Sequence, residues 1–199
     1  MLPILKEHKE KFQMLGMAVL LYCIWHFGYE LYLAKETRFD WTINRVLGMQ
    51  TATWFTIFGG YDARVVNYSI YPHLMYLNAL PIISIDTPCN GFPMIYLFCS
   101  FIIIYPAPLQ RKIVFLLTGA TMIYVLNLIR IITLSYISIY MEDYFYFNHK
   151  YAFQIIVYMT IISLWVYWVT YGSDKRVSWA TGFLDFVKFK FVSKLLQAI

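Results

Sequence analysis

Long apolar runs separated by short polar segments dominate this chain. Four runs, residues 14–33, 92–105, 112–140 and 151–171, carry few charged side chains. An α-helix needs about 20 such residues to cross a bilayer, and 92–105 is slightly short unless its helix begins near Asn90. Pro106 and Pro108 end the second run, and Gly172 ends the fourth. The pattern predicts an all-α membrane protein with about four transmembrane helices.

Two further stretches have a weaker pattern. Residues 46–58 are apolar on one side but carry Gln50 and three threonines, which favours an interfacial helix. Residues 69–85 are apolar but broken by prolines and Asn78, which favours an extended hairpin on the outer face. If both stretches crossed the membrane, the chain would have six spans and the same orientation.

The composition agrees with a chain buried in lipid. Of its 199 residues, 60% are hydrophobic and 14% are charged, whereas soluble domains are nearer half and a quarter. The first run is too long for a signal-peptide core, so we expect a retained span. No linker divides the chain, which predicts one transmembrane domain (1–172) followed by a basic amphipathic cytoplasmic tail (173–199). Three cysteines do not form a disulfide framework.

The distribution of charge predicts the orientation. The net charge of +5 comes from residues at the ends of apolar runs, which is typical of membrane topology and excludes a nucleic-acid partner. With four spans and the N-terminus inside, the inner side holds ten of the 16 basic residues and four of the 11 acidic ones. The positive-inside rule therefore favours a multi-pass protein with both termini in the cytoplasm.

Three polar residues are predicted at the same depth. Arg130 lies 19 residues after Arg111, a rise of roughly 28 Å, which is close to the thickness of the hydrocarbon core. Asn127 shares its helix face one turn deeper. Cys89 directly precedes the second run and His149 directly precedes the fourth. A thiol, a guanidinium and an imidazole therefore come to the outer end of the bundle.

Each of these residues also has an ordinary structural interpretation. A cysteine in an apolar run is usually a small apolar residue, and Cys23 and Cys99 are assigned that role. An arginine at a span end can extend to lipid headgroups. Together, however, the three side chains match acyl transfer through a thioester, with a nucleophile, a proton carrier and an oxyanion donor. No metal-ligand spacing and no phosphate loop is present, so we expect no metal and no cofactor.

At these residues the chain resembles the exosortase/archaeosortase family, over about 86–172. The resemblance lies in Cys-Asn-Gly (89–91), Asn-Leu-Ile-Arg-Ile (127–131) and His149. It implies that Cys89 is the nucleophile, Arg130 stabilises the oxyanion or thiolate, and His149 is the general acid and base. Asn127, Asn90 and Gly91 would support them. The chain is similar to the short forms found in Bacteroidota, although many relatives carry serine after the cysteine and about twice the spans.

The same resemblance implies the substrates and the location. The enzyme would be a transpeptidase or cysteine protease of the bacterial inner membrane, with its active site on the extracytoplasmic face. It would cleave exported proteins at a C-terminal sorting signal of motif, hydrophobic helix and basic tail, and pass the acyl group to an unknown acceptor nucleophile. Two alternatives remain open. One is a non-enzymatic membrane scaffold or assembly subunit in which Arg130 pairs with Asp143 or with an acid of a partner protein, and the other is a transporter in which Arg130 is the anion site for the substrate. No inverted repeat favours the transporter.

Overall fold

A computed structural model describes residues 9–33, 39–66, 74–85 and 89–172. The predicted cytoplasmic tail, 173–199, lies outside these residues. The first half of the described chain contains α2 (Lys9–Cys23), η1 (Ile24–Leu33), α4 (Phe39–Gly59), β1 (Ala63–Val66), β2 (Leu74–Leu77) and β3 (Leu80–Ser84). The second half contains α5 (Phe92–Ile104), α6 (Leu109–Tyr140), α7 (Glu142–Phe147), η3 (Asn148–Ala152), α8 (Phe153–Tyr167) and η4 (Trp168–Gly172).

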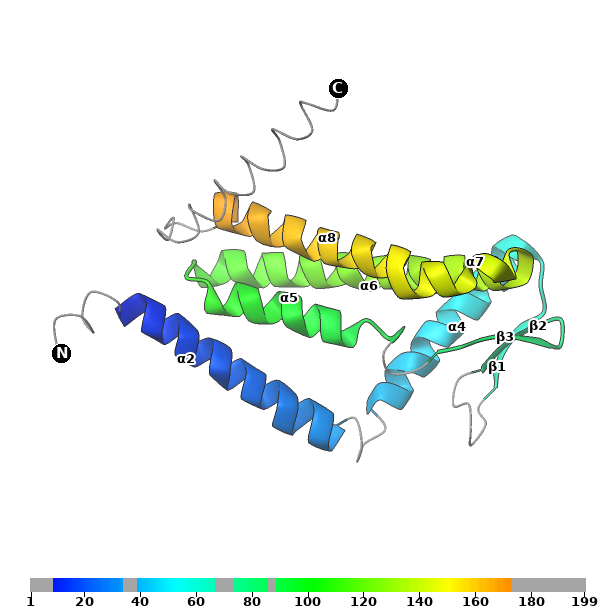
Figure 1. Ribbon diagram of the computed structural model, residues 1–199, viewed down its shortest axis with the longest axis horizontal. Coiled ribbons are helices and arrows are strands. Elements are labelled where there is room, and N and C mark those ends of the chain that lie inside the picture. The colour runs from blue at the N-terminus through cyan, green and yellow to red at the C-terminus, as the bar shows by residue number, and fades with distance from the viewer. Residues whose placement is uncertain (1–8, 34–38, 67–73, 86–88, 173–199) are drawn as a thin grey trace, which may run out of the picture.

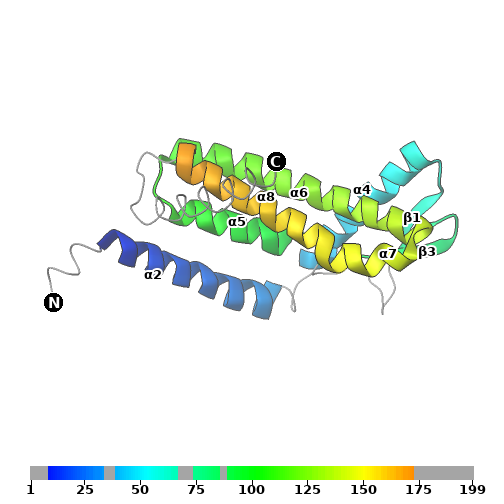
Figure 2. The ribbon, with the colours of Figure 1, turned by 45° about the horizontal axis from the view of Figure 1, so that its top comes forward.

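The described chain is mostly helical; α5, α6 and α8 run side by side, whereas α4 lies at an angle to them (Figures 1 and 2). Within the described residues, three helices are long and apolar enough to cross a membrane: Phe12–Leu31, Leu109–Tyr140 and Glu142–Tyr171. Large apolar side chains such as Leu15, Leu117 and Ile155 are more than 60% exposed on them. Such exposure fits contact with lipid, and the protein is membrane-associated. Helix α5 has 13 residues, about 20 Å, and is shorter than these three.

Helices α5, α6 and α8 share one apolar core. Phe98 and Ile102 of α5 pack with Ile123 of α6 and Ile161 of α8, and all four are at most 1% exposed. Gly119 permits this contact, because a Cβ at that position would lie 2.2 Å from the ring of Phe98. The core holds the N-terminal end of α5, and the loop before it, at a fixed height beside α6.

The fourth apolar run forms a longer helix than the sequence predicts. It extends from Glu142 to Gly172 through α7, η3, α8 and η4, so His149 lies inside a helix and not in the segment before one. No proline or glycine stands between Met141 and Gly172 to end it. Tyr144 also accepts a hydrogen bond at its carbonyl from the Asn148 side chain, which keeps that polar residue within the helix. The sequence pattern placed the start of this helix too late because residues 148–150 are polar and resemble a loop. Polar residues can also lie on a helical turn.

Helix α4 contains the predicted interfacial segment 46–58 but begins seven residues earlier. Its buried residues follow a helical spacing along one face: Asp40, Asn44, Leu47, Gly48, Thr51, Ala52 and Phe55. This face packs on β1 and α6, because Leu47 lies with Ile131, and Phe55 lies with Tyr136 at 4.8 Å between rings. The buried face of α4 therefore contacts protein.

Residues 74–84 form an antiparallel hairpin, and β1 adds a third strand that the sequence pattern does not reveal. The strand order is β1-β2-β3, so β3 is an edge strand. Asn78 and Ala79 at the turn both have positive φ, 48° and 67°, as a tight two-residue hairpin requires. Met75 and Leu77 are buried against α4 and α6. The sheet and α4 lie together at one end of the helix bundle (Figure 1).

Candidate active site

The loop that carries Cys89 is held against α6 by Asn127, which contacts Gly91 and hydrogen-bonds the Cys89 backbone. Gly91 has a φ of +75°, a conformation that favours glycine, and a Cβ there would lie 2.9 Å from Cγ of Asn127. The Asn127 amide in turn donates a hydrogen bond of 3.0 Å to the carbonyl oxygen of Cys89. Asn127 and Gly91 therefore fix the backbone of the cysteine to the helix that carries Arg130.

Asn90 fixes the same loop from the opposite side. Its side chain is 1% exposed, and its oxygen accepts a 3.0 Å hydrogen bond from the backbone N–H of Phe92 at the start of α5. Its amide nitrogen donates to Asp40 at 2.8 Å. Because Asn90 faces a buried carboxylate, we assign it to positioning the loop and not to contact with a substrate.

Asp40 is a site residue that sequence reasoning missed. It is 4% exposed and accepts hydrogen bonds from the hydroxyl of Tyr29, at 2.9 and 3.1 Å, as well as from Asn90. A buried carboxylate needs such donors to be stable. One feature of the sequence could have indicated its burial: at helical spacing, Asp40 lies on the same face of α4 as Leu47 and Phe55. Tyr29 and Asp40 thereby connect the first long helix to the cysteine loop.

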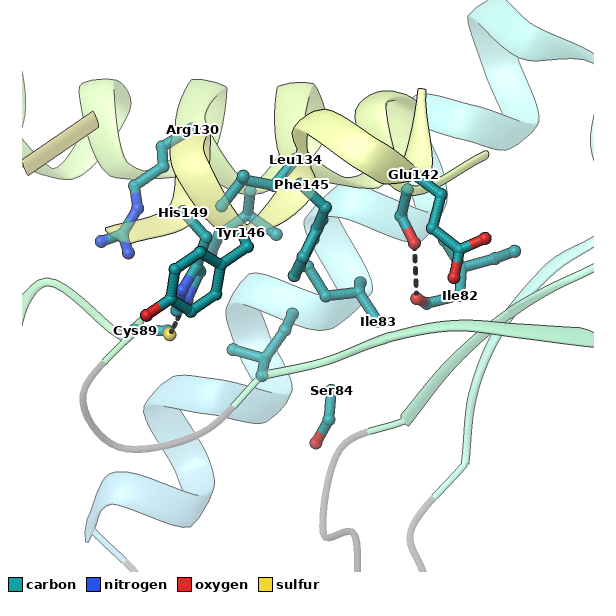
Figure 3. A pocket seen from close by; sticks show the side chains of 13 residues that line it. Ile82, Ile83, Ser84, Cys89, Arg130, Leu134, Glu142, Phe145, Tyr146 and His149 are labelled. Carbon is teal, nitrogen blue, oxygen red and sulfur yellow. Dashed lines mark hydrogen bonds between the residues drawn. The ribbon is translucent and has the colours of Figure 1, made fainter. Parts of the chain in front are cut away.

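Cys89 and His149 are in direct contact. The Sγ atom of Cys89 lies 3.5 Å from Nε2 of His149, which is hydrogen-bond distance for sulfur, and both side chains are partly buried (Figure 3). The imidazole stacks on Phe145, one turn earlier in the helix, with 5.7 Å between ring centroids and 9° between planes. This stacking fixes the orientation of the imidazole, so that Nε2 faces the thiol.

Arg130 lines the same pocket as Cys89 and His149, and its guanidinium points to the side of α6 on which they lie (Figure 3). Its Nε is buried without a hydrogen-bond partner within the described residues. In this part of the chain, Arg130 also forms no ion pair with a carboxylate. A partly buried cation without an acceptor is a site for an anion or a polarised carbonyl oxygen.

The pocket is an open cavity of about 680 Å³. Helix α6 forms its floor, the strand β3 and Ile85 form one wall, and α7 and η3 form the other. The residues that line it are Ile82, Ile83, Ser84, Ile85, Cys89, Arg130, Ile131, Leu134, Ser138, Glu142, Phe145, Tyr146 and His149. A thiol, an imidazole and a guanidinium therefore face one open cavity.

Cys99 and His26 lie in surroundings that differ from those of Cys89 and His149. Cys99 packs against the apolar core of the bundle, and His26 contacts Glu30 at 2.8 Å on an exposed helix face. Within the described residues, no group of three or more histidine, cysteine, aspartate or glutamate side chains could hold a metal ion.

The fold and the pocket together define a membrane-associated helical protein with a Cys–His pair at one end of its bundle. The chain matches no family model, no curated protein and no solved structure at significant similarity. The functional conclusion therefore depends on the geometry of the site.

Proposed function

We propose that this protein is a membrane-embedded cysteine transpeptidase or protease of the exosortase type, which cleaves C-terminal sorting signals of exported proteins. One observation carries the proposal: the Cys89 thiol lies 3.5 Å from His149 in an open pocket that Arg130 also lines. A nucleophile in contact with a base, beside a cation that has no carboxylate partner among the described residues, is the minimal arrangement for acyl transfer.

In the first half of the reaction, the imidazole of His149 accepts the thiol proton and the thiolate sulfur attacks a peptide carbonyl carbon. A C–S bond forms, and the π electrons of the carbonyl move to its oxygen. Arg130 donates to this oxyanion from the same pocket. The C–N bond then breaks, His149 returns its proton to the leaving amine, and a thioester remains on Cys89.

In the second half, an acceptor amine or water attacks the thioester carbon while His149 takes its proton. The oxyanion forms again beside Arg130, the C–S bond breaks, and the thiolate leaves and is reprotonated from His149. The exposed opening of the pocket admits either acceptor. Attack by an amine transfers the acyl group to an acceptor, and attack by water hydrolyses it.

The proposed topology has four spans, with α5 as the short one. At one end of α5 the Lys112 ammonium donates to the Ile103 carbonyl, and at the other Asn127 donates to the carbonyl of Cys89. Residues 112 and 127 are about 22 Å apart along α6. The chain from Ile103 to Cys89 therefore covers most of the hydrocarbon thickness, roughly 30 Å. With positive charges inside, both termini are cytoplasmic and Cys89 is at the outer face of the inner membrane.

A non-enzymatic scaffold is the alternative. It requires Arg130 to pair with Asp143 or with an acid of a partner protein. Asp143 is exposed and forms no ion pair with Arg130 within the described residues, which leaves the partner's acid. The scaffold predicts that Cys89→Ser has no effect on the protein's role. The transpeptidase predicts that the same change slows turnover by orders of magnitude, because a serine hydroxyl is a far weaker nucleophile here.

The test uses tagged exported proteins of the source organism that end in a hydrophobic helix and a basic tail. Co-expressed with the intact enzyme, at least one of them is shortened at its C-terminus, as seen by immunoblot. With Cys89→Ala the tagged protein stays at full length, whereas Cys99→Ala, a thiol outside the pocket, leaves cleavage intact. Normal cleavage by a membrane-inserted Cys89→Ala variant would refute the proposal.

A further inference from the structure

The pocket has the dimensions of a groove for an extended peptide. Its floor is one face of α6 from Arg130 to Ser138, a length of eight residues and about 12 Å. An extended chain rises about 3.3 Å per residue, so the groove holds about four residues. Cys89 and His149 lie at the Arg130 end, and Glu142 lies toward the Ser138 end (Figure 3).

The walls of the groove suit an extended chain. One wall is β3, an edge strand, and an edge strand leaves backbone groups on one side without a partner in the sheet. The Ser138 hydroxyl donates to one of these, the carbonyl of Ile82, at 3.2 Å. Apolar side chains of Ile83, Leu134 and Phe145 line the space between the walls. A peptide can therefore lie along β3 with its apolar side chains against this lining.

The charges of the groove are separated along its length. Arg130 lies at the catalytic end, and among the described residues that line the pocket Glu142 is the only one with an acidic side chain. Glu142 forms no hydrogen bond or ion pair within the described part of the chain. It precedes His149 by seven residues in one continuous helix, which is about 10 Å. Three residues of extended chain cover that distance.

The proposed function determines the direction of the peptide. The hydrophobic helix of a sorting signal follows the cleavage site and lies in the bilayer beside the helix bundle. The residues before the cleavage site therefore extend the other way, toward the end of the molecule that carries the sheet (Figure 1). The position three residues before the scissile carbonyl thus comes to Glu142.

From these features we infer that Glu142 is a specificity-determining residue, which binds a lysine or arginine side chain three residues before the residue whose carbonyl Cys89 attacks. The inference rests on the proposed function, because it assumes that Cys89 is the nucleophile. It adds a substrate class that the resemblance does not supply: extended segments with a basic side chain at that position.

The experiment compares two peptide probes on the full-length protein in detergent. They are acetyl-Lys-Ala-Ala-Ala-chloromethyl ketone and the same peptide with glutamate in place of lysine. The Cys89 thiolate displaces chloride from either probe, forming a stable C–S bond, and peptide mapping by mass spectrometry gives the rate at Cys89. We expect the lysine probe to react about threefold faster, since an ion pair at an exposed carboxylate such as Glu142 contributes a factor of roughly this size.

A charge reversal supplies the matched control. Glu142→Lys is expected to reverse the preference, so that the glutamate probe reacts faster. Asp143→Lys makes the same change at the next residue, which is also exposed but does not line the pocket, and is expected to leave the preference unchanged. Equal rates for both probes in the intact protein, or a preference that survives Glu142→Lys, would overturn the inference while leaving Cys89 as the nucleophile. Absence of any adduct at Cys89 would instead overturn the proposed function.

Discussion

Replacing Gly91 with alanine tests how the cysteine loop is held. The backbone of Gly91 has a φ of +75°, and moving an alanine into that left-handed region costs about 1 kcal/mol. The new Cβ would also lie 2.9 Å from Cγ and 3.0 Å from Nδ2 of Asn127. The Asn127 side chain must move away, and its hydrogen bond to the Cys89 carbonyl, worth about 1 kcal/mol, is lost. Together, Gly91→Ala is expected to destabilise the protein by about 2–3 kcal/mol.

Gly60 provides the matched control for the backbone term. It has a similar φ of +67°, but a Cβ at that position meets nothing within 4 Å. Gly60→Ala is therefore expected to cost only the backbone term, about 1 kcal/mol. The difference between the two variants, about 1–2 kcal/mol, measures the contact between Gly91 and Asn127 together with the hydrogen bond that depends on it.

The assay has two parts. Unfolding of the purified protein by SDS in mixed micelles, followed by circular dichroism, gives the stability of each variant. Alkylation of Cys89 by iodoacetamide, mapped by mass spectrometry, reports the state of the loop and is expected to change in Gly91→Ala but not in Gly60→Ala. If the two variants were equally stable and equally reactive, the Asn127 contact would have no part in holding the loop.

Two further variants test residues around the thiol. Asp40→Ala removes the buried acceptor of Tyr29 and Asn90 and leaves two buried donors unpaired. It is expected to lower stability by about 2–4 kcal/mol in the same SDS assay. The control Asp62→Ala loses only an exposed pair with Arg64 and should change stability by less than about 1 kcal/mol. Arg130→Lys keeps the charge but loses the planar group of donors. It is expected to slow cleavage of a tagged substrate at least tenfold without loss of membrane insertion. Cleavage at the normal rate would exclude Arg130 from oxyanion binding.

The apolar pattern predicted the long helices because length and hydrophobicity in lipid are properties of a continuous segment. Residues 112–140 fall within α6, Leu109–Tyr140, and 92–105 contains α5. The strand β1 was not predictable, because Ala63–Val66 is too short to carry a periodic signal and becomes a strand by pairing with β2. The helical start at Glu142 was missed for a different reason: a polar turn that includes Asn148 resembles a loop unless the absence of proline and glycine is given more weight.

For the site too, the sequence predicted the features that depend on one segment and missed those that depend on packing between segments. The rise of a helix predicts the depth of Arg130 along the axis of α6, because 1.5 Å per residue holds along any regular helix. The rise does not predict the direction in which a side chain points around the helix axis. The contact between Cys89 and His149 therefore depends on the packing of α5, α6 and the helix that carries η3. Asp40 acts only through Asn90, and no local pattern connects residues 50 positions apart. Since Asn127 holds the loop from α6 and Asp40 holds it from α4, Cys89 is positioned by the two helices together, and loosening either one should disturb the thiol.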